Sequence, residues 1–143
     1  MIILDTTVLA YAVGEEHPLR DPCRRLLSAH AEGRIEATTT VEVIQEFAHV
    51  RARRQTRAEA GRLARRYMAA FTLVVTTPDD LDRGLDLFEQ YPMVGAFDAV
   101  LAAVALVRRA DALVSADRAF ASIPGLSFVD PTTRDLVRLI GDS

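Results

Sequence analysis

MIILD, residues 1 to 5, is a run of four apolar residues that ends at a carboxylate. A short apolar run predicts a strand that is buried on both faces, as in a parallel sheet. Asp5 would then stand at the carboxyl end of that strand, the edge at which open α/β sheets bind ligands. The alternative is that Asp5 merely caps the apolar segment from Val8 to Ala12. The run therefore predicts a buried strand and leaves two roles open for its last residue.

The composition indicates one globular unit. A chain of 143 residues that is 50% hydrophobic can bury a core without disulfides or a structural metal, so we expect a single domain over residues 1–143. The single cysteine, Cys23, cannot form an internal disulfide, which favours a reducing compartment. Since the sequence shows neither a basic leader nor an apolar run of about 18 residues, it predicts a soluble, cytoplasmic protein without a membrane anchor.

Downstream of residue 5, segments of strand and helix type alternate. Strands are predicted at 35–40, 72–77, 112–117 and 126–130, and helices at 18–33, 41–54, 57–71, 81–91, 97–110 and 131–140. Thr40 is the expected cap of helix 41–54, Asp79 or Asp80 that of helix 81–91, and Pro131 lies at or near the start of the last helix. This alternation predicts an α/β fold, a three-layer α/β/α sandwich with a central parallel sheet.

Carboxylates stand at matching places in this pattern. The segment ALVSAD, which ends at Asp117, repeats the pattern of MIILD, so Asp5 and Asp117 would point into one crevice. Asp98 lies in the first turn of the most apolar helix, where the helix dipole alone would also favour an acid. A helical wheel places Glu46 at roughly 130° from the centre of an apolar stripe, and Glu42 roughly opposite it. The stripe comprises Val41, Val43, Ile44, Phe47, Ala48 and Val50. Glu46 is therefore the candidate for the crevice, the alternative being a solvated side chain.

Four carboxylates in one pocket require compensation. At ~6 Å and an effective dielectric constant of ~20, each like-charge pair costs about 3 kcal/mol. Either some of the acids are protonated, or arginines enter the pocket, or a divalent cation is bound. A set of oxygen ligands without His or Cys suits Mg²⁺ or Mn²⁺ better than zinc.

The chain resembles the PIN-domain ribonucleases, and in particular the VapC-type toxins of bacterial toxin–antitoxin pairs. The matching pieces are MIILDTTVLAYAVGEEHP, VIQEFAHVRARR, FDAVLAAVAL and LVSADRAF, in that order and across nearly the whole length. The resemblance implies a PIN-like, Rossmann-like fold and places the four acids of the family on Asp5, Glu46, Asp98 and Asp117. The chain departs from the family at Thr7, where Asn or Ser is common, and at Ala119, where a further acid is frequent.

The resemblance also implies a chemistry, namely hydrolysis of RNA phosphodiesters with Mg²⁺ or Mn²⁺. Asp5 and Asp98 would be direct metal ligands, with Asp117 and Glu46 holding a second metal, a metal-bound water or the attacking water. Thr6 and Ser115 would orient these carboxylates from behind. The implied partners are RNA, a small antitoxin and a second copy of the chain in a homodimer.

The chain carries a net charge of −3, and its 17 cations are all arginines, seven of them between Arg51 and Arg66. Arg51 and Arg54 could contact RNA phosphates, although a solvated arginine face is the alternative. Three other functions stay open on the sequence: a PIN nuclease of RNA processing without an antitoxin, a nuclease-dead interaction domain, and a phosphatase with Asp5 as nucleophile. The phosphatase usually needs a second acid at the place of Thr7.

Overall fold

The computed structural model describes residues 1–141 and has a parallel sheet at its centre. The strands lie in the order β2-β1-β3-β4, and every pairing is parallel. Their bounds are β1 Ile2–Leu4, β2 Ala37–Thr38, β3 Ala112–Val114 and β4 Phe128–Val129. In β1, Ile3 and Leu4 are fully buried, because β2 and β3 pair with this strand on its two sides. The predicted buried strand at the start of the chain is therefore confirmed.

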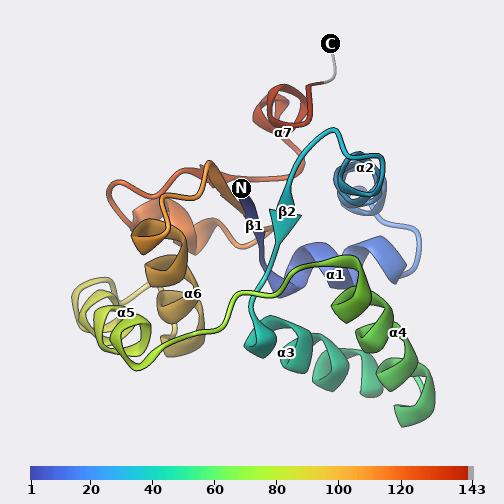
Figure 1. Ribbon diagram of the computed structural model, residues 1–143, viewed down its shortest axis with the longest axis horizontal. Coiled ribbons are helices and arrows are strands. Elements are labelled where there is room, and N and C mark those ends of the chain that lie inside the picture. Colours follow the sequence, from blue (N-terminus) through green and yellow to red (C-terminus); the bar gives the residue numbers. More distant parts are fainter. Residues whose placement is uncertain (142–143) are drawn as a thin grey trace.

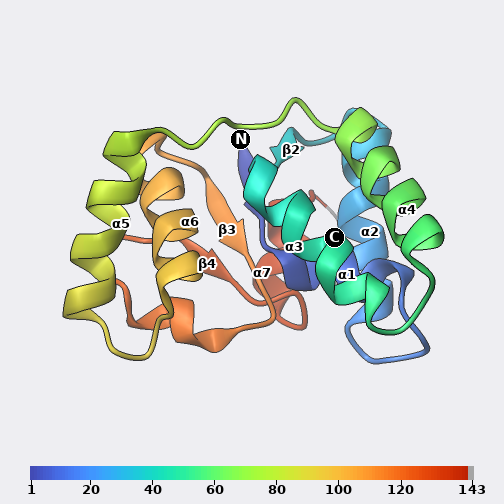
Figure 2. The same cartoon turned by 90° about the horizontal axis from the view of Figure 1, so that it is seen from below.

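Helices cover both faces of the sheet (Figures 1 and 2). Figure 2 shows α5 and α6 on one side of the strands and α1 to α4 on the other. The bounds are α1 Thr6–Val13, α2 Arg20–Ala31, α3 Val41–Ala52, α4 Arg57–Ala70, α5 Pro78–Gln90, α6 Ala96–Val107 and α7 Arg134–Leu139, with a 3₁₀ helix, η1, at Arg118–Ser122. This arrangement confirms the predicted α/β/α fold. Within residues 1–141, no helix is both long and apolar enough to cross a membrane.

Two local contacts show how the helices are fixed in place. Thr40 caps α3 as expected, with its hydroxyl accepting a hydrogen bond from the Val43 backbone at 3.3 Å. On the other side of the sheet, α5 packs against α6 at Gly84, where an added Cβ would lie 2.6 Å from the Cα of Val100. Gly84 therefore permits a close approach of these helices that any larger residue would prevent.

The predicted strand at residues 72–77 is wrong. Only a single bridge, between Thr40 and Val74, joins this segment to the sheet. The carbonyl of Thr72 accepts the Thr38 hydroxyl at 2.6 Å. Because α3 begins one residue after Thr40, the neighbouring chain is too short in extended form to pair with the whole segment. It crosses the edge of the sheet as an extended connection between α4 and α5 (Figure 1).

Three predicted helix starts are also wrong. Helix α2 begins at Arg20 instead of Pro18, because the His17 carbonyl and ring hold the next residues in a turn. Helix α5 begins at Pro78 and is capped by Thr77, not by Asp79 or Asp80. Asp80 completes that cap from inside the helix by accepting the Thr77 backbone N–H at 2.8 Å.

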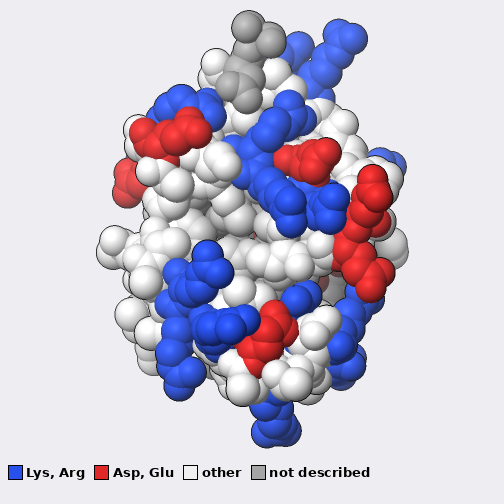
Figure 3. Space-filling model, turned by 90° about the vertical axis from the view of Figure 1, so that its right-hand side faces the viewer, with Lys and Arg blue, Asp and Glu red and all other residues white. Residues whose placement is uncertain are grey.

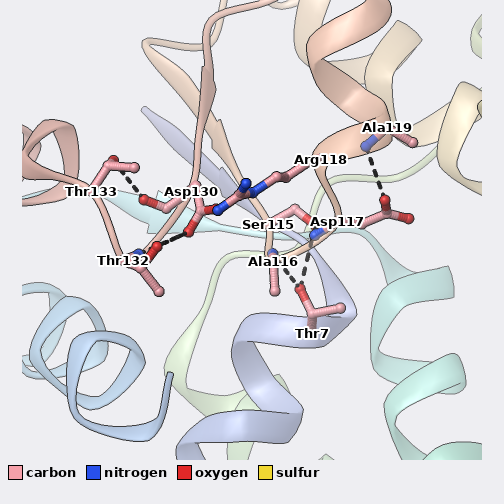
Figure 4. Close-up of polar contacts among 9 residues, drawn as sticks. All are labelled: Thr7, Ser115, Ala116, Asp117, Arg118, Ala119, Asp130, Thr132 and Thr133. Carbon is pink, nitrogen blue, oxygen red and sulfur yellow. Dashed lines mark hydrogen bonds and ion pairs between the residues drawn. The ribbon is translucent and has the colours of Figure 1, made fainter. Parts of the chain in front are cut away.

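The last helix starts three residues later than its proline suggested. After β4, the Asp130 side chain accepts the Thr132 backbone N–H at 2.8 Å, and its carbonyl accepts the Thr133 hydroxyl at 2.8 Å. These bonds hold a turn over Pro131, shown in Figure 4, so α7 begins only at Arg134.

Apolar side chains do not all face the core. Val41, predicted on the buried stripe of its helix, is 47% exposed, and the apolar face of α5 is open to solvent at Leu81, Leu85 and Phe88. Leu81 and Leu85 line a groove together with Phe97 of α6. The chain therefore presents an apolar surface at this end.

Candidate active site

Carboxylates from four elements line one cavity of about 460 Å³. Asp5 follows β1, Glu46 lies in α3, Asp98 lies in the first turn of α6, and Asp117 follows β3 and precedes η1. Parallel strands end at the same edge of a sheet, and the N-terminus of α6 and the flank of α3 meet that edge. The structure thus brings together the four acids that the sequence singled out.

Asp5 is the most buried of the four, with 3% of its surface exposed. Its Oδ2 accepts hydrogen bonds from the Ser115 hydroxyl at 2.6 Å and the Thr7 hydroxyl at 3.0 Å. Burial raises the pKa of Asp5, and the two hydroxyl bonds offset this only in part. Asp5 is the N-cap residue of α1 but forms no side-chain capping hydrogen bond there, and its carboxylate is held instead by Ser115 and Thr7.

Thr7 and Ser115, which both bind Asp5, also bind the loop that carries Asp117, and Figure 4 shows their contacts with this loop. The Ser115 Oγ accepts the backbone N–H of Asp117 at 2.9 Å, and the Thr7 Oγ1 accepts that of Ala116 at 3.0 Å. The carboxylate of Asp117 accepts the Ala119 backbone N–H at 3.0 Å. Ser115 thus holds Asp5 as expected, whereas Thr7 was not among the predicted site residues. The position of Thr7, two residues after Asp5, is the feature of the sequence that could have indicated its role.

Glu46 and Glu42 lie in different environments, although they are one turn apart on α3. The Glu46 Oε2 accepts the Thr6 hydroxyl at 3.0 Å, as expected for Thr6, and Glu46 lines the acidic cavity. Burial raises the pKa of Glu46, and the negative charge of Asp5 adds to this effect. Glu42 accepts the Thr76 hydroxyl at 3.0 Å and lines the apolar groove instead.

Asp98 is half-buried and lies near the charges of the other three acids. Burial, together with the negative charges of Asp5, Asp117 and Glu46, raises its pKa to about 7. Within residues 1–141, no hydrogen bond or ion pair compensates its charge. The cavity therefore favours a proton or a cation at Asp98.

The chemistry of these acids fits a divalent cation, although their side chains are not arranged as a complete set of metal ligands. Among the described residues, no three His, Cys, Asp or Glu side chains are grouped so that they could hold a metal ion. The hydrogen bonds above engage an oxygen of Asp5, of Glu46 and of Asp117, and all three residues line the cavity. The carboxylates are therefore held in place beside one another, and carboxylate oxygens are hard ligands suited to Mg²⁺ or Mn²⁺.

Arg51 and Arg54 line the same cavity but differ in their partners. The Arg51 guanidinium donates to Glu59 at 2.9 Å and to the Val13 carbonyl at 3.4 Å, which ties α3 to α4 and α1. Arg54 is exposed, and no residue of the described chain forms an ion pair with it. Further arginines lie on the side of the molecule that carries α2 and α4, where Figure 3 shows basic groups interspersed with acidic ones. The cations thus form no continuous basic surface there.

A fold in which β1 and β3 bring aspartates together at one edge, with acids from α3 and α6 beside them, agrees with the comparison with protein families. The PIN domain model matches residues 2–126, so the chain belongs to the PIN domain family.

Among individual proteins, the chain is 54% identical to Ribonuclease VapC7 of Mycobacterium tuberculosis over 144 aligned residues, which cover 99% of both chains. The crystal structure of VapBC2 from Rickettsia felis, bound to a DNA fragment from its promoter, matches with a TM-score of 0.73 and 17% identity over 91% of this chain and 98% of that one. A toxin–antitoxin complex from Klebsiella pneumoniae matches with a TM-score of 0.68 and 20% identity over 92% and 98%. The resemblance to VapC-type toxins is confirmed, and PIN proteins of this type generally depend on a divalent metal.

Proposed function

We propose that this chain, as one PIN domain, is a divalent-metal-dependent endoribonuclease that acts as the toxin of a toxin–antitoxin pair. The observation that carries the proposal is the convergence of Asp5, Glu46, Asp98 and Asp117 on one cavity, where none of the four forms an ion pair within residues 1–141. The full-length similarity to a protein named as a VapC ribonuclease supports RNA as the substrate.

In the proposed reaction, a water attacks the phosphorus, one P–O ester bond breaks, and the departing oxygen takes a proton from solvent. Asp5 and Asp98 would hold Mg²⁺ or Mn²⁺, with Asp117 and Glu46 completing the site. When bound, the cation would acidify water and neutralise charge on the phosphate. Glu46, which lines the cavity and is aligned by Thr6, would accept the proton of the attacking water.

Thr6, Thr7 and Ser115 do not meet the substrate in this scheme. They act by fixing one oxygen of Glu46 or Asp5, so that the remaining oxygens keep their direction when the ligand arrives. Removing one of these hydroxyls would therefore loosen the site without changing its charge.

A small antitoxin is the proposed inhibitor, and the charge of the cavity supplies the reason. An arginine or lysine of such a partner could pair with Asp5, Asp98 or Asp117 and so compete with the cation. Apolar anchorage is available in the lining of the same cavity, at Ala10 and Val50. The solved toxin–antitoxin complexes with the same fold support a protein partner for this chain.

The expected homodimer and cytoplasmic location stay predictions. The apolar groove lined by Leu81, Leu85 and Phe97 is the surface we propose for a second copy. Sedimentation analysis of the purified chain and of Leu85→Glu would test this: the substitution should convert a dimer to a monomer.

The decisive experiment is to purify the chain free of any co-expressed partner and to incubate it with total RNA. We expect discrete cleavage with Mg²⁺ or Mn²⁺ and none with a chelator. In cells, the chain should arrest growth, co-expression of the neighbouring upstream gene should relieve the arrest, and Asp5→Asn should be harmless. Growth arrest by Asp5→Asn as strong as that by the parent chain would contradict the proposal.

A further inference from the structure

The cavity that holds the four carboxylates extends well beyond them. Its far part is lined by Tyr11 of α1, by Arg54 at the end of α3, and by His17 in the loop after α1. Both helices run from the sheet toward the same side of the molecule (Figure 1). With a rise of ~1.5 Å per residue, Tyr11 lies ~6 Å along α1 from Thr7, and Arg54 lies ~12 Å along from Glu46. The acids therefore occupy one end of a longer cavity.

The rings of Tyr11 and His17 form a pair in this far part. Their centroids are 4.6 Å apart, and their planes are inclined by 32°. The imidazole is fixed by the Leu19 backbone N–H, which donates to its Nδ1 at 3.1 Å. Because both rings are already held, a planar ligand that stacks on them would lose little of its binding energy to ordering the protein.

Charges near the pair indicate what kind of planar ligand fits. Glu15 and Glu16 line the cavity beside His17, so a phosphate would be repelled there, whereas an uncharged base would not. Arg54 lies in the turn after α3, without an ion-pair partner in residues 1–141, while the guanidinium of Arg51 is already engaged by Glu59. A strand could thus place a base on the ring pair and a phosphate on Arg54.

We propose that Tyr11 and His17 form a stacking subsite for a nucleobase of single-stranded RNA, next to the phosphodiester held at the acids, and that Arg54 binds a phosphate of the same strand. This inference rests on the proposed ribonuclease function. Aromatic and imidazole rings stack on unpaired bases, whereas the bases of a duplex are stacked on each other and not available. The subsite therefore makes single-stranded RNA the preferred substrate.

The test is steady-state cleavage of a mixed-sequence, single-stranded RNA of about 20 nucleotides that carries a fluorophore and a quencher. Tyr11→Leu keeps an apolar side chain but removes the ring, so KM should rise about 5- to 150-fold, with kcat changed less than about twofold. Tyr11→Phe keeps the ring and should stay within about twofold of the parent chain. Arg54→Gln should raise KM and weaken the salt dependence of KM. The same RNA annealed to its complement should be cut far more slowly.

Phe88→Leu is the matched control, because Phe88 is an exposed ring on α5 that lies outside this cavity. Its KM should equal that of the parent chain. If Tyr11→Leu does not fold, as judged by its thermal unfolding, His17→Ala at an exposed loop position takes its place. His17→Ala is expected to raise KM in the same direction.

A binding readout separates failure of the subsite from failure of the nuclease. In a chelator, the same RNA with 2-aminopurine at successive positions should lose fluorescence when it stacks on the parent chain, and not on Tyr11→Leu. Quenching without cleavage would overturn the nuclease and keep the subsite. Cleavage with an unchanged KM in Tyr11→Leu would overturn the subsite. An unchanged KM combined with weaker inhibition by the upstream gene product would assign the rings to a protein partner and likewise overturn it.

Discussion

Asp5 and Asp80 are two aspartates with nearly equal exposed fractions, but their pKa values are shifted in opposite directions. Asp80 is 2% exposed, and its two oxygens accept hydrogen bonds from the Arg108 guanidinium, both at 2.9 Å, which lowers its pKa to about 2. Asp5 is 3% exposed and has no ion-pair partner within residues 1–141, and burial raises its pKa. The difference teaches that burial alone does not identify a functional acid. An acid with no cation of its own leaves a charge that something outside the chain must balance.

We expect the largest effect, on RNA cleavage, from neutralising the acids of the cavity. Asp5→Asn and Asp98→Asn should each lower RNA cleavage by more than about 100-fold. In a chelator, both variants should unfold at a higher temperature than the parent chain, because each substitution removes a like-charge repulsion. The increase in Tm should be about 2–4 °C for each 1 kcal/mol of repulsion relieved. Full cleavage by either variant, with metal still required, would contradict the assignment of the ligands.

The next effect separates two glutamates of one helix. Glu46→Gln should lower kcat by about 10- to 100-fold, because Glu46 lines the acidic cavity and is aligned by Thr6. Glu42→Gln should stay within about twofold of the parent, because Glu42 faces Thr76 at the apolar groove. Cleavage assays of both variants under identical conditions decide this, and a reversed order would remove Glu46 from the mechanism.

A smaller effect, on stability alone, is expected from substitution of Asp80. Asp80→Asn leaves the Arg108 guanidinium without its carboxylate, so the free energy of unfolding should fall by about 1–3 kcal/mol. Urea unfolding at pH 7 measures this change. The folded fraction of Asp80→Asn should cleave RNA at the parental rate. A loss of cleavage in that fraction would show that the two acidic regions are not independent.

The smallest effect is a dependence of stability on pH. The folded pKa of Asp80, about 2, lies below the value of 3.8 for an unperturbed aspartate, so its ion pair stabilises the fold fully above about pH 4. That stability, about 1–2 kcal/mol because Arg108 is partly solvated, should be lost as the pH falls from about 4 to 2. Asp80→Asn should lack this part of the acid unfolding curve. An identical curve for both chains would contradict the strength assigned to the pair.

The sequence predicted the parts of the fold that depend on local patterns. Alternation of apolar runs with helical segments indicated the parallel sheet, and the strand-end aspartates indicated the edge at which Asp5 and Asp117 meet. The segment 72–77 has the composition of a strand, yet α3 starts too early for it to find a partner, and no local pattern contains that information.

Local patterns also could not predict several contacts between residues that are distant in the sequence. Thr7 binds the backbone of Ala116, and Asp80 pairs with Arg108, so each partnership depends on how two helices or loops meet in space. The ring pair of Tyr11 and His17 is close in sequence, but its place in the acidic cavity depends on the position of α3. Thr6 and Ser115, which hold Glu46 and Asp5, could be predicted together with the acids, whereas the contacts of Thr7 could not.

The central place of β1 in the sheet has a consequence for the timing of synthesis. β1 needs β3 as its neighbour, and Asp5 receives its hydrogen bond from Ser115, a residue 110 positions later. At about 5–20 residues per second, the ribosome takes roughly 5–20 s to make the chain between them. During that interval the nascent chain carries its first acid without the strand that completes the site. The protein therefore cannot complete this site while most of it is still being translated.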